Sequence, residues 1–208
     1  MQESRPTDLL LSLGVSRESL AKLDVYVEIL TQWQTSINLV GSSTLDAIWI
    51  RHVVDAAQLM PLFSSEDRRL ADLGSGAGIP GLVLAIAGSY EVDLYESNGK
   101  KAAFLREAIR RTGAKASVHQ VRLETLPTLI TWPRVDCVVA RALAPLKQLL
   151  EFAEPFLSTG AKAFFHKGQD IDVELTEATK YWKLNTIKHQ SITDSRGVII
   201  EIRKAVRG

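Results

Sequence analysis

Asp72 and the glycines that follow it are the residues whose types and spacing most clearly suggest chemistry. Gly74, Gly76 and Gly78 alternate with small residues behind this acid. Glycines at such spacing leave backbone amides bare, so that a ligand can approach the main chain closely. Gly76, Gly78 and Gly81 also match the spacing of the dinucleotide-binding fingerprint, so the glycines alone do not identify the ligand.

The acid favours one class of ligand over another. The carboxylate of Asp72 is expected at the mouth of the turn, where it would repel a pyrophosphate at close range. S-adenosylmethionine has no phosphate, and it presents ammonium and sulfonium charges, two ribose hydroxyls and an adenine. An acid followed by alternating glycines resembles the first motif of the Rossmann-type methyltransferases and favours this ligand. A tight structural turn that binds nothing is the alternative.

Residues after the next two expected strands fit the same ligand. Glu96 lies 24 positions after Asp72, close to the spacing of about 20 residues at which such folds place a carboxylate on ribose hydroxyls. Leu123 and Glu124 follow the third expected strand and could face the adenine. Helix initiation explains Glu124 equally well.

Two cations follow expected central strands. Arg141 ends a continuous apolar run, and Lys167 follows a later apolar strand beside a glycine. Because the carboxyl ends of parallel strands meet at one edge of a sheet, both side chains are expected near the cofactor. A salt bridge from Arg141 to Asp72 or Glu124 is compatible with that position.

Arg51, His52 and Asp55 stand at spacings of three and four residues in an expected helix, which places all three on one face. An ordinary surface ion pair beside a histidine is the simpler interpretation of this group. The spacing by itself therefore assigns these residues no function.

These side chains can meet only if strands alternate with helices. Periodicity predicts strands at 69–73, 91–95, 117–121, 135–140, 161–165, 184–192 and 198–202. It predicts helices at 17–34, 45–60, 79–87, 99–112, 146–157 and 171–182, with Gly88 and Gly113 in the capping place after two of them. The order indicates an α/β fold with a mostly parallel sheet and helices on both faces. Together with the glycine motif, the seven strands resemble the Rossmann-like fold of the class I S-adenosylmethionine-dependent methyltransferases. Residues 1–62 are expected to form an N-terminal helical extension packed on the core at 63–208, in one compact unit.

The composition narrows the class of protein. Over 208 residues the formal net charge is only +1, so any contact with nucleic acid must come from a local patch. Cys137 is the single cysteine, which excludes an intrachain disulfide and fits a reducing compartment. The sequence shows no leader, membrane-length apolar run or metal-ligand cluster. We therefore expect a soluble, cytoplasmic monomer that binds no metal.

Several short stretches in a fixed order carry a more specific signal. They are Asn38-Leu39, Arg51-His52-x-x-Asp55, the glycine stretch ending in Ile79-Pro80-Gly81, Glu96-Ser-x-Gly-Lys-Lys-x-x-Phe-Leu, Arg122-x-Glu124, Arg141-Ala-x-Ala-Pro-Leu and Lys167-Gly168. Together they resemble the RsmG family, also called glucose-inhibited division protein B, over most of the chain. The one departure is Ala56, where the family usually has serine, and it lies away from the glycine turn.

The resemblance implies a bacterial enzyme that transfers methyl from S-adenosylmethionine to nitrogen 7 of a guanine in 16S ribosomal RNA, without a general base. It implies cofactor-contacting positions at Gly74, Ile79, Leu123, Glu124 and Arg141. The expected cofactor site also includes Asp72, Gly76 and Gly78 of the glycine turn, and Glu96 as the partner of the ribose. It implies substrate-positioning roles for Arg141, Lys167, Arg51 and His52. The 16S RNA is expected within a small ribosomal subunit or an assembly intermediate.

Other functions remain open from the sequence. A methyltransferase could act on a different acceptor, and an NAD(P)-dependent oxidoreductase could use the same glycines. A non-enzymatic RNA-binding assembly factor could retain the scaffold alone, although the presence of both Glu96 and Glu124 favours an equipped cofactor site.

Overall fold

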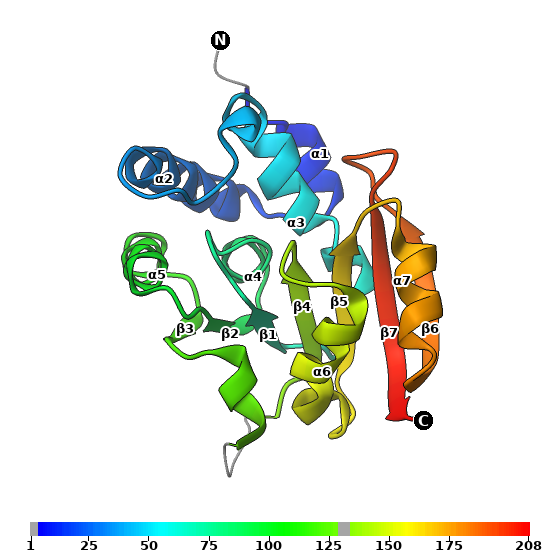
Figure 1. Cartoon of the computed structure of the whole chain (residues 1–208). Helices are drawn as coiled ribbons and strands as arrows, with labels where there is room; N and C mark the ends of the chain where they lie inside the picture. Colours follow the sequence, from blue (N-terminus) through cyan, green and yellow to red (C-terminus); the bar gives the residue numbers. More distant parts are fainter. Residues whose placement is uncertain (1–3, 129–133) are drawn as a thin grey trace.

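The computed structural model describes residues 4–128 and 134–208. Their strands form one seven-stranded sheet in the order β3-β2-β1-β4-β5-β7-β6 (Figure 1). The strands are β1 (Arg69–Leu73), β2 (Glu91–Tyr95), β3 (Ala116–His119), β4 (Cys137–Arg141), β5 (Lys162–Lys167), β6 (Trp182–Gln190) and β7 (Val198–Arg207). Only β7 runs antiparallel to its neighbours β5 and β6. The predicted fold class is confirmed.

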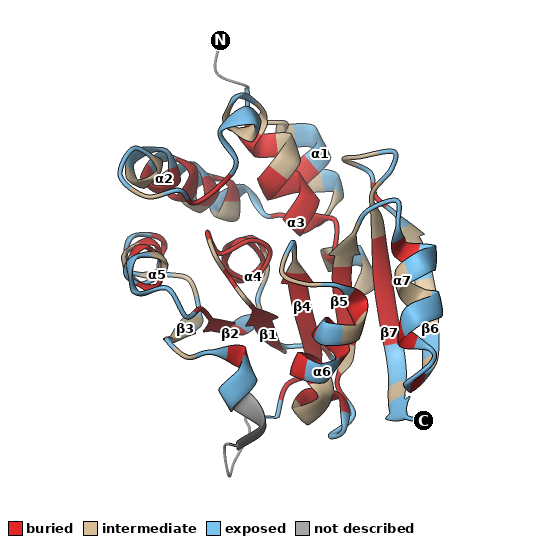
Figure 2. Ribbon diagram, in the orientation of Figure 1, coloured by how far each residue is buried: buried red, intermediate tan, exposed pale blue. Residues whose placement is uncertain are grey.

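Helices cover both faces of the sheet. They are α1 (Thr7–Ser12), α2 (Arg17–Gln34), α3 (Asp55–Ala57), α4 (Gly81–Ala87), α5 (Gly99–Thr112), α6 (Leu146–Leu157) and α7 (Ile171–Ala178). The N-terminal helices, α4 and α5 share one apolar cluster with strand residues such as Leu70 and Val139, whereas α6 and α7 pack with Ala71 and Val138 on the other face. Figure 2 shows buried residues throughout the central strands. Because helices cover both faces of the central parallel strands, residues of both parities in these strands are mostly apolar, with Asp72 of β1 and Asp93 of β2 as buried charged exceptions.

The N-terminal region is joined to the core through α2. Ser16 caps this helix by accepting a hydrogen bond from the Ser19 amide at 3.0 Å, and the helix has the predicted bounds. The ring of Tyr26 is fully buried near Phe104 of α5, and its hydroxyl donates to the Ala77 carbonyl at 2.7 Å. One side chain thus ties the N-terminal region to the glycine turn.

The predicted helix at 45–60 is wrong as a single element. The chain instead forms a 3-10 turn at Ser42–Ala47, a π-helical turn at Trp49–Val54, the short α3 and a 3-10 turn at Met60–Leu62. A π turn contains more residues than an α turn, so the spacing of three and four residues no longer defines one face. Arg51 and Asp55 line one cavity, and His52 lines another.

The predicted start of α4 is also wrong. The helix begins at Gly81 rather than at 79, because Gly78 closes a turn by donating from its amide to the Ser75 carbonyl at 2.6 Å. Gly88 does cap the helix, with its amide donating to the Leu84 carbonyl at 2.9 Å, although its φ of −115° is not left-handed. A Cβ at Gly88 would lie 2.4 Å from the Tyr90 ring, so that the close approach of this ring explains the glycine. Gly113, in contrast, closes α5 with a left-handed φ of 67°.

The described residues contain no helix that is both long and apolar enough to cross a membrane.

Tyr26→Phe keeps the buried ring but removes the donor to the Ala77 carbonyl. Because a buried carbonyl that loses its partner is costly, we expect the free energy of unfolding to fall by about 1–3 kcal/mol in urea titrations. Tyr181→Phe, on an exposed ring, is the matched control and should change it by less than about 0.5 kcal/mol. Equal effects of the two substitutions would show that the Tyr26 hydroxyl does not stabilise the fold.

Candidate functional site

The turn between β1 and α4 requires glycine at several positions. Gly74, Gly76 and Gly78 have φ angles of 69°, 54° and 81°, which lie in the left-handed region that side chains disfavour. A Cβ on Gly74 would also stand 2.5 Å from the Cδ1 atom of Leu143, and one on Gly78 would stand 2.6 Å from the Cβ atom of Leu82. The turn is therefore fixed both by its own backbone and by the residues packed against it.

Glu96 joins the end of β2 to this turn. Its Oε2 atom accepts from the Gly76 amide at 2.8 Å, and its Oε1 atom accepts from the Asn98 amide at 2.7 Å. A carboxylate can accept about four hydrogen bonds, so Glu96 keeps acceptor capacity for a ligand. Since it already occupies the Gly76 amide with a negative charge, it also disfavours a pyrophosphate at the turn.

Asp72 does not lie at the mouth of the turn, and that expectation is wrong. Its side chain is fully buried beneath α4, where Oδ2 accepts from the Gly81 amide at 3.2 Å and Oδ1 has no partner among the described residues. Burial raises the pKa of the Asp72 carboxyl to about 7, with a smaller contribution from the charge of Glu96. The sheet alternation explains the position, because residue 72 points toward the face that α4 covers.

Three cavities lie along the carboxyl edge of the parallel strands. Cavity A, of about 380 Å³, extends from the glycine turn to the residues after β3. It is lined by Gly74, Gly76, Tyr95, Glu96, Ser97, Lys101, Val121, Leu123, Glu124, Ala142, Leu143, Ala144, Gln148 and Phe152. The predicted residues Gly74, Gly76, Glu96, Leu123 and Glu124 are thus brought together in one cavity.

Cavity B, of about 320 Å³, lies between the glycine turn and the N-terminal region. It is lined by Leu39, Val40, Gly41, Thr44, His52, Gly74, Ser75, Gly76, Ala77, Ile79, Lys101, Arg141 and Ala142. Ile79, His52 and Arg141 therefore meet here, whereas the predicted residues Asp72 and Gly78 line neither cavity A nor cavity B.

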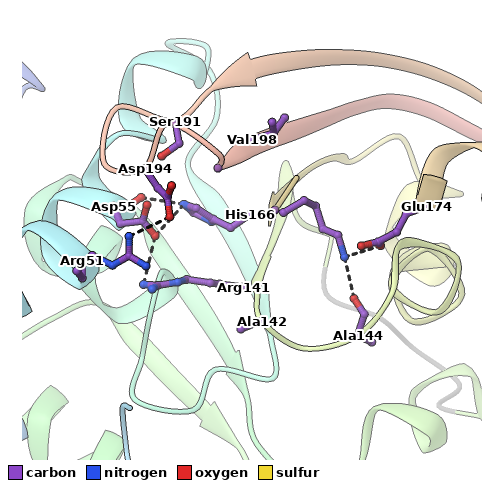
Figure 3. Close-up of a pocket in the computed structure, with 13 residues that line it drawn as sticks. Arg51, Asp55, Arg141, Ala142, Ala144, His166, Glu174, Ser191, Asp194 and Val198 are labelled. Atoms are coloured by element: carbon purple, nitrogen blue, oxygen red, sulfur yellow. Dashed lines mark hydrogen bonds and ion pairs between the residues drawn. The ribbon is translucent and has the colours of Figure 1, made fainter. Parts of the chain in front are cut away.

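Cavity C, of about 280 Å³, is the most highly charged of the three (Figure 3). It is lined by Arg51, Asp55, Arg141, Ala142, Ala144, His166, Lys167, Gly168, Glu174, Ser191, Asp194, Gly197 and Val198. Arg51, Arg141 and Lys167 are thus brought together, and none of the glycine-turn residues belongs to this cavity.

Ala142 lines all three cavities. Its φ of 51° is the only left-handed one among the described residues other than glycine, a conformation that alanine adopts at a cost of roughly 1–2 kcal/mol. Arg141 is shared by cavities B and C, and Ala144 by cavities A and C. The loop after β4 is therefore the place where the three cavities meet.

Arg141 is held by Asp55 rather than by Asp72 or Glu124, the two alternative partners that the sequence offered. One guanidinium nitrogen, NH1, lies 3.2 Å from Asp55 Oδ2. The other carboxylate oxygen accepts from Gln58 at 2.7 Å and from the Thr193 hydroxyl at 2.5 Å. His166 donates to the Asp55 carbonyl at 2.8 Å. This network connects α3, the ends of β4 and β5, and the connection between β6 and β7.

His52 forms a hydrogen-bond chain on the other side of Arg141. Arg141 NH1 donates to His52 Nδ1 at 3.2 Å, so the ring proton resides on Nε2, which donates to the Thr44 hydroxyl at 2.8 Å. Thr44 in turn donates to the Gly41 carbonyl at 2.7 Å. Burial and then the Arg141 charge lower the pKa of His52 to about 4. The ring is therefore neutral near pH 7 and acts as an acceptor for Arg141.

The other two cations of cavity C also have acidic partners. Arg51 NH1 lies 3.1 Å from Asp194 Oδ2, and Lys167 Nζ lies 2.6 Å from Glu174 Oε2 (Figure 3). Sequence patterns missed Asp194, which meets Arg51 across 143 positions. They also missed Glu174 and the anchoring Thr44, because each lies on a different element from its nearby partner, so that the spacing within one helix or strand does not relate the two. Lys101, which lines cavities A and B, belongs to the stretch that begins at Glu96 in the family resemblance, but the sequence assigned it no role in the cofactor site.

The donor set of cavities A and B fits S-adenosylmethionine. Glu96 offers lone pairs for ribose hydroxyls, and Leu123 with Phe152 offers apolar surface for an adenine. Arg141 and Lys101 can balance a carboxylate, and the exposed backbone of the glycine turn can approach the ligand closely. No group of three or more His, Cys, Asp or Glu side chains suited to a metal ion occurs within residues 4–128 and 134–208.

Comparison with known proteins points to one family. Residues 19–202 match the GidB family profile, described as rRNA small subunit methyltransferase G. Ribosomal RNA small subunit methyltransferase G of Nitrobacter hamburgensis is 50% identical over 93% of this chain and 75% of its own. The protein of that name from Rhodospirillum rubrum is 50% identical over 90% and 92%.

A solved structure shows the same fold at much lower sequence identity. The glycopeptide N-methyltransferase MtfA, complexed with S-adenosylmethionine, matches 74% of this chain and 94% of its own with a TM-score of 0.59. At 11% identity this likeness concerns the fold alone.

Asp72→Asn tests the buried carboxyl. An unfolded aspartate has a pKa near 4, whereas that of folded Asp72 is about 7. Between these pH values the unfolded state releases a proton that the folded state keeps, so stability present at low pH is lost as pH rises toward 7. The variant does not lose stability in this way, because asparagine does not ionise. Its stability relative to wild type should therefore rise between pH 4 and pH 8, by up to roughly 4 kcal/mol, in urea titrations.

Asp8→Asn, on the exposed surface of α1, is the control and should keep the pH dependence of the wild-type protein. If the difference in free energy of unfolding between Asp72→Asn and wild type stays constant across this pH range, the Asp72 carboxyl is not neutral in the folded protein.

Proposed function

Because the chain belongs to the rRNA small subunit methyltransferase G family, we propose that it methylates nitrogen 7 of a guanine in 16S ribosomal RNA. The chain is an S-adenosylmethionine-dependent methyltransferase of small-subunit ribosomal RNA. The observation that carries the proposal is the meeting of three cavities at Ala142, one lined by Glu96, the proposed ribose partner, and another by three cations. Nitrogen 7 as the acceptor rests on the ordered motifs of the sequence.

The proposed cofactor site divides between two cavities. Glu96, Leu123 and Glu124 in cavity A would hold the adenosine half. Ile79 and Arg141 in cavity B, with the glycine turn, would hold the amino-acid half. When bound, the cofactor supplies an electrophilic methyl group on a sulfonium. Asp72 and Gly78 would act indirectly by fixing the turn. Asp72 accepts from the Gly81 amide, and Gly78 packs closely against Leu82.

The proposed chemistry needs no general base. Nitrogen 7 of guanine has an in-plane lone pair and no proton, so no residue has to remove one. The role of the chain is then alignment and electrostatics. His52, which accepts from Arg141, and His166, which donates to the Asp55 carbonyl, are both engaged in positioning Arg141.

The proposed substrate-positioning cations must leave nitrogen 7 free. A bidentate arginine on O6 and nitrogen 7 of guanine would occupy the reacting lone pair. Arg141, Arg51 and Lys167 would therefore contact O6 or phosphate groups in the reactive complex. Because A-form helices hide the edge that carries nitrogen 7, the target base is expected to be unpaired or extruded.

The substrate is proposed to be an assembled or assembling small subunit, methylated by a monomeric enzyme. With a formal net charge of only +1, the chain has little long-range attraction for free RNA. A surface supplied by ribosomal proteins or folded RNA would compensate for this. Such a substrate places the activity in the cytoplasm, where ribosomes assemble.

The activity is tested with labelled S-adenosylmethionine and two substrates from a strain that lacks the enzyme, free 16S RNA and small subunits. We expect label on nitrogen 7 of one guanine, with small subunits the better substrate. Label on another base, or none on RNA, would contradict the proposed acceptor. Nicotinamide cofactors should not shift the melting temperature, whereas S-adenosylmethionine should raise it.

Gly74→Ala tests the proposed cofactor turn against a matched control. Gly74 and Gly113 have nearly the same φ, 69° and 67°, so alanine strains both by roughly 1–2 kcal/mol. Only at Gly74 does the added Cβ meet a neighbour, Leu143 of cavity A. We expect calorimetry to show at least about a tenfold loss of S-adenosylmethionine affinity in Gly74→Ala, or about 1.4 kcal/mol. Gly113→Ala should bind like wild type, and unchanged affinity in both variants would remove Gly74 from the site.

A further inference from the structure

One wall of cavity C is formed by an ion pair that stands apart from the Arg141 network. Lys167 ends β5, and its ammonium contacts Glu174 of α7 and the Ala144 carbonyl. Its neighbour His166 instead points toward Asp55 (Figure 3). Glu174 of α7 meets Lys167 at 2.6 Å from Nζ to Oε2. The side chain of Lys167 is only 9% exposed and that of Glu174 is 24% exposed. A pair so far withdrawn from water is held in one geometry.

The ammonium of Lys167 keeps one donor for a ligand. Of its three N–H groups, one is directed at Glu174 and a second at the Ala144 carbonyl, 3.1 Å away. Ala144 lines both cavity C and cavity A. The remaining donor is thus fixed close to the loop that separates the two cavities.

Glu174 keeps one oxygen for a ligand. Its Oε2 atom accepts from Lys167 and from the Leu146 amide at 2.5 Å. Its Oε1 atom has no hydrogen-bond partner in the described part of the chain. The pair therefore presents a donor and a free anionic acceptor side by side in cavity C.

We propose that the Lys167–Glu174 pair recognises the target base as guanine, with the ammonium on O6 and the carboxylate on the N1–H and 2-amino donors. The inference rests on the proposed function and assigns Glu174 as a specificity-determining residue. The Watson–Crick edge of guanine shows one acceptor followed by two donors, which complements a cation beside a carboxylate. Adenine shows a donor in place of O6 and would oppose the ammonium in the same pose.

This pose leaves the reacting atom free. In guanine, O6 lies next to nitrogen 7, on the side of the ring away from the 2-amino group. A base held at O6 by Lys167, whose ammonium is bonded to Ala144, therefore turns its nitrogen 7 edge toward the loop that cavities A and C share. Lys167 contacts only O6, so it does not occupy the lone pair of nitrogen 7.

Glu174 also has a structural role that the test must separate. Its bond to the Leu146 amide lies at the start of α6, so a substitution can reduce stability without any contact to substrate. A comparison of two substrates within one variant cancels that effect. Inosine suits this purpose, because it lacks the 2-amino group of guanosine but keeps O6, N1–H and nitrogen 7.

The experiment measures kcat/KM for methyl transfer to reconstituted small subunits that carry guanosine or inosine at the methylated position. Wild type should prefer guanosine by about 10-fold, which lies within the range of discrimination that a bidentate hydrogen-bonded contact to a base provides. Glu174→Gln should lower kcat/KM for guanosine by a similar factor and show less than about a twofold preference between the bases. Glu177→Gln is the matched control. It alters an exposed ion pair between Glu177 of α7 and Lys180 and should keep the wild-type preference.

Two results would overturn the assignment. One is a wild-type enzyme that methylates guanosine and inosine equally well, and this result needs no variant to fold. The other is a folded Glu174→Gln variant that retains the full preference for guanosine. Failure of wild type to methylate guanosine-containing subunits would instead contradict the proposed function itself, so the two failures are distinguishable.

Discussion

The ion pair between Asp55 and Arg141 is the interaction on which the arrangement of the site depends. A guanidinium withdrawn from water needs a carboxylate and well-placed hydrogen bonds to remain charged. Asp55 meets this need from the N-terminal region, and Gln58 and Thr193 orient its other oxygen. The N-terminal region is thereby part of the site rather than a separate cover, since without it the Arg141 side chain would have no fixed direction.

The same balance of charge extends across cavity C. Arg51 and Lys167 are paired with Asp194 and Glu174, as Arg141 is with Asp55. Each cation is therefore held in place by an acid, and the cavity carries little net charge. Such a surface favours a substrate whose donors and acceptors match it in detail over a polyanion that offers negative charge alone. This agrees with the near-neutral charge of the whole chain.

Two acids near the glycine motif have different roles because their surroundings differ. Asp72 is fully buried, and burial raises the pKa of its carboxyl to about 7. Glu96 lines cavity A and accepts from two backbone amides. One acid therefore supports α4 through Gly81, while the other presents a charge to the ligand. A pyrophosphate at the turn would meet the carboxylate of Glu96, which accepts from the Gly76 amide, rather than that of the buried Asp72.

The sequence by itself determined the fold class, most element positions and one half of the site. Strand β1, strand β2 and helix α2 have their predicted bounds, because apolar periodicity and caps are local properties. Gly74 and Glu96 share a cavity because parallel strands end at one edge. Only the tertiary structure decided the π turn, the burial of Asp72 and the pairs Asp55–Arg141 and Lys167–Glu174. The Asp55–Arg141 pair depends on which distant segments pack together. Lys167 and Glu174 lie only seven positions apart but on different elements, β5 and α7, so the spacing within one helix or strand does not record their contact.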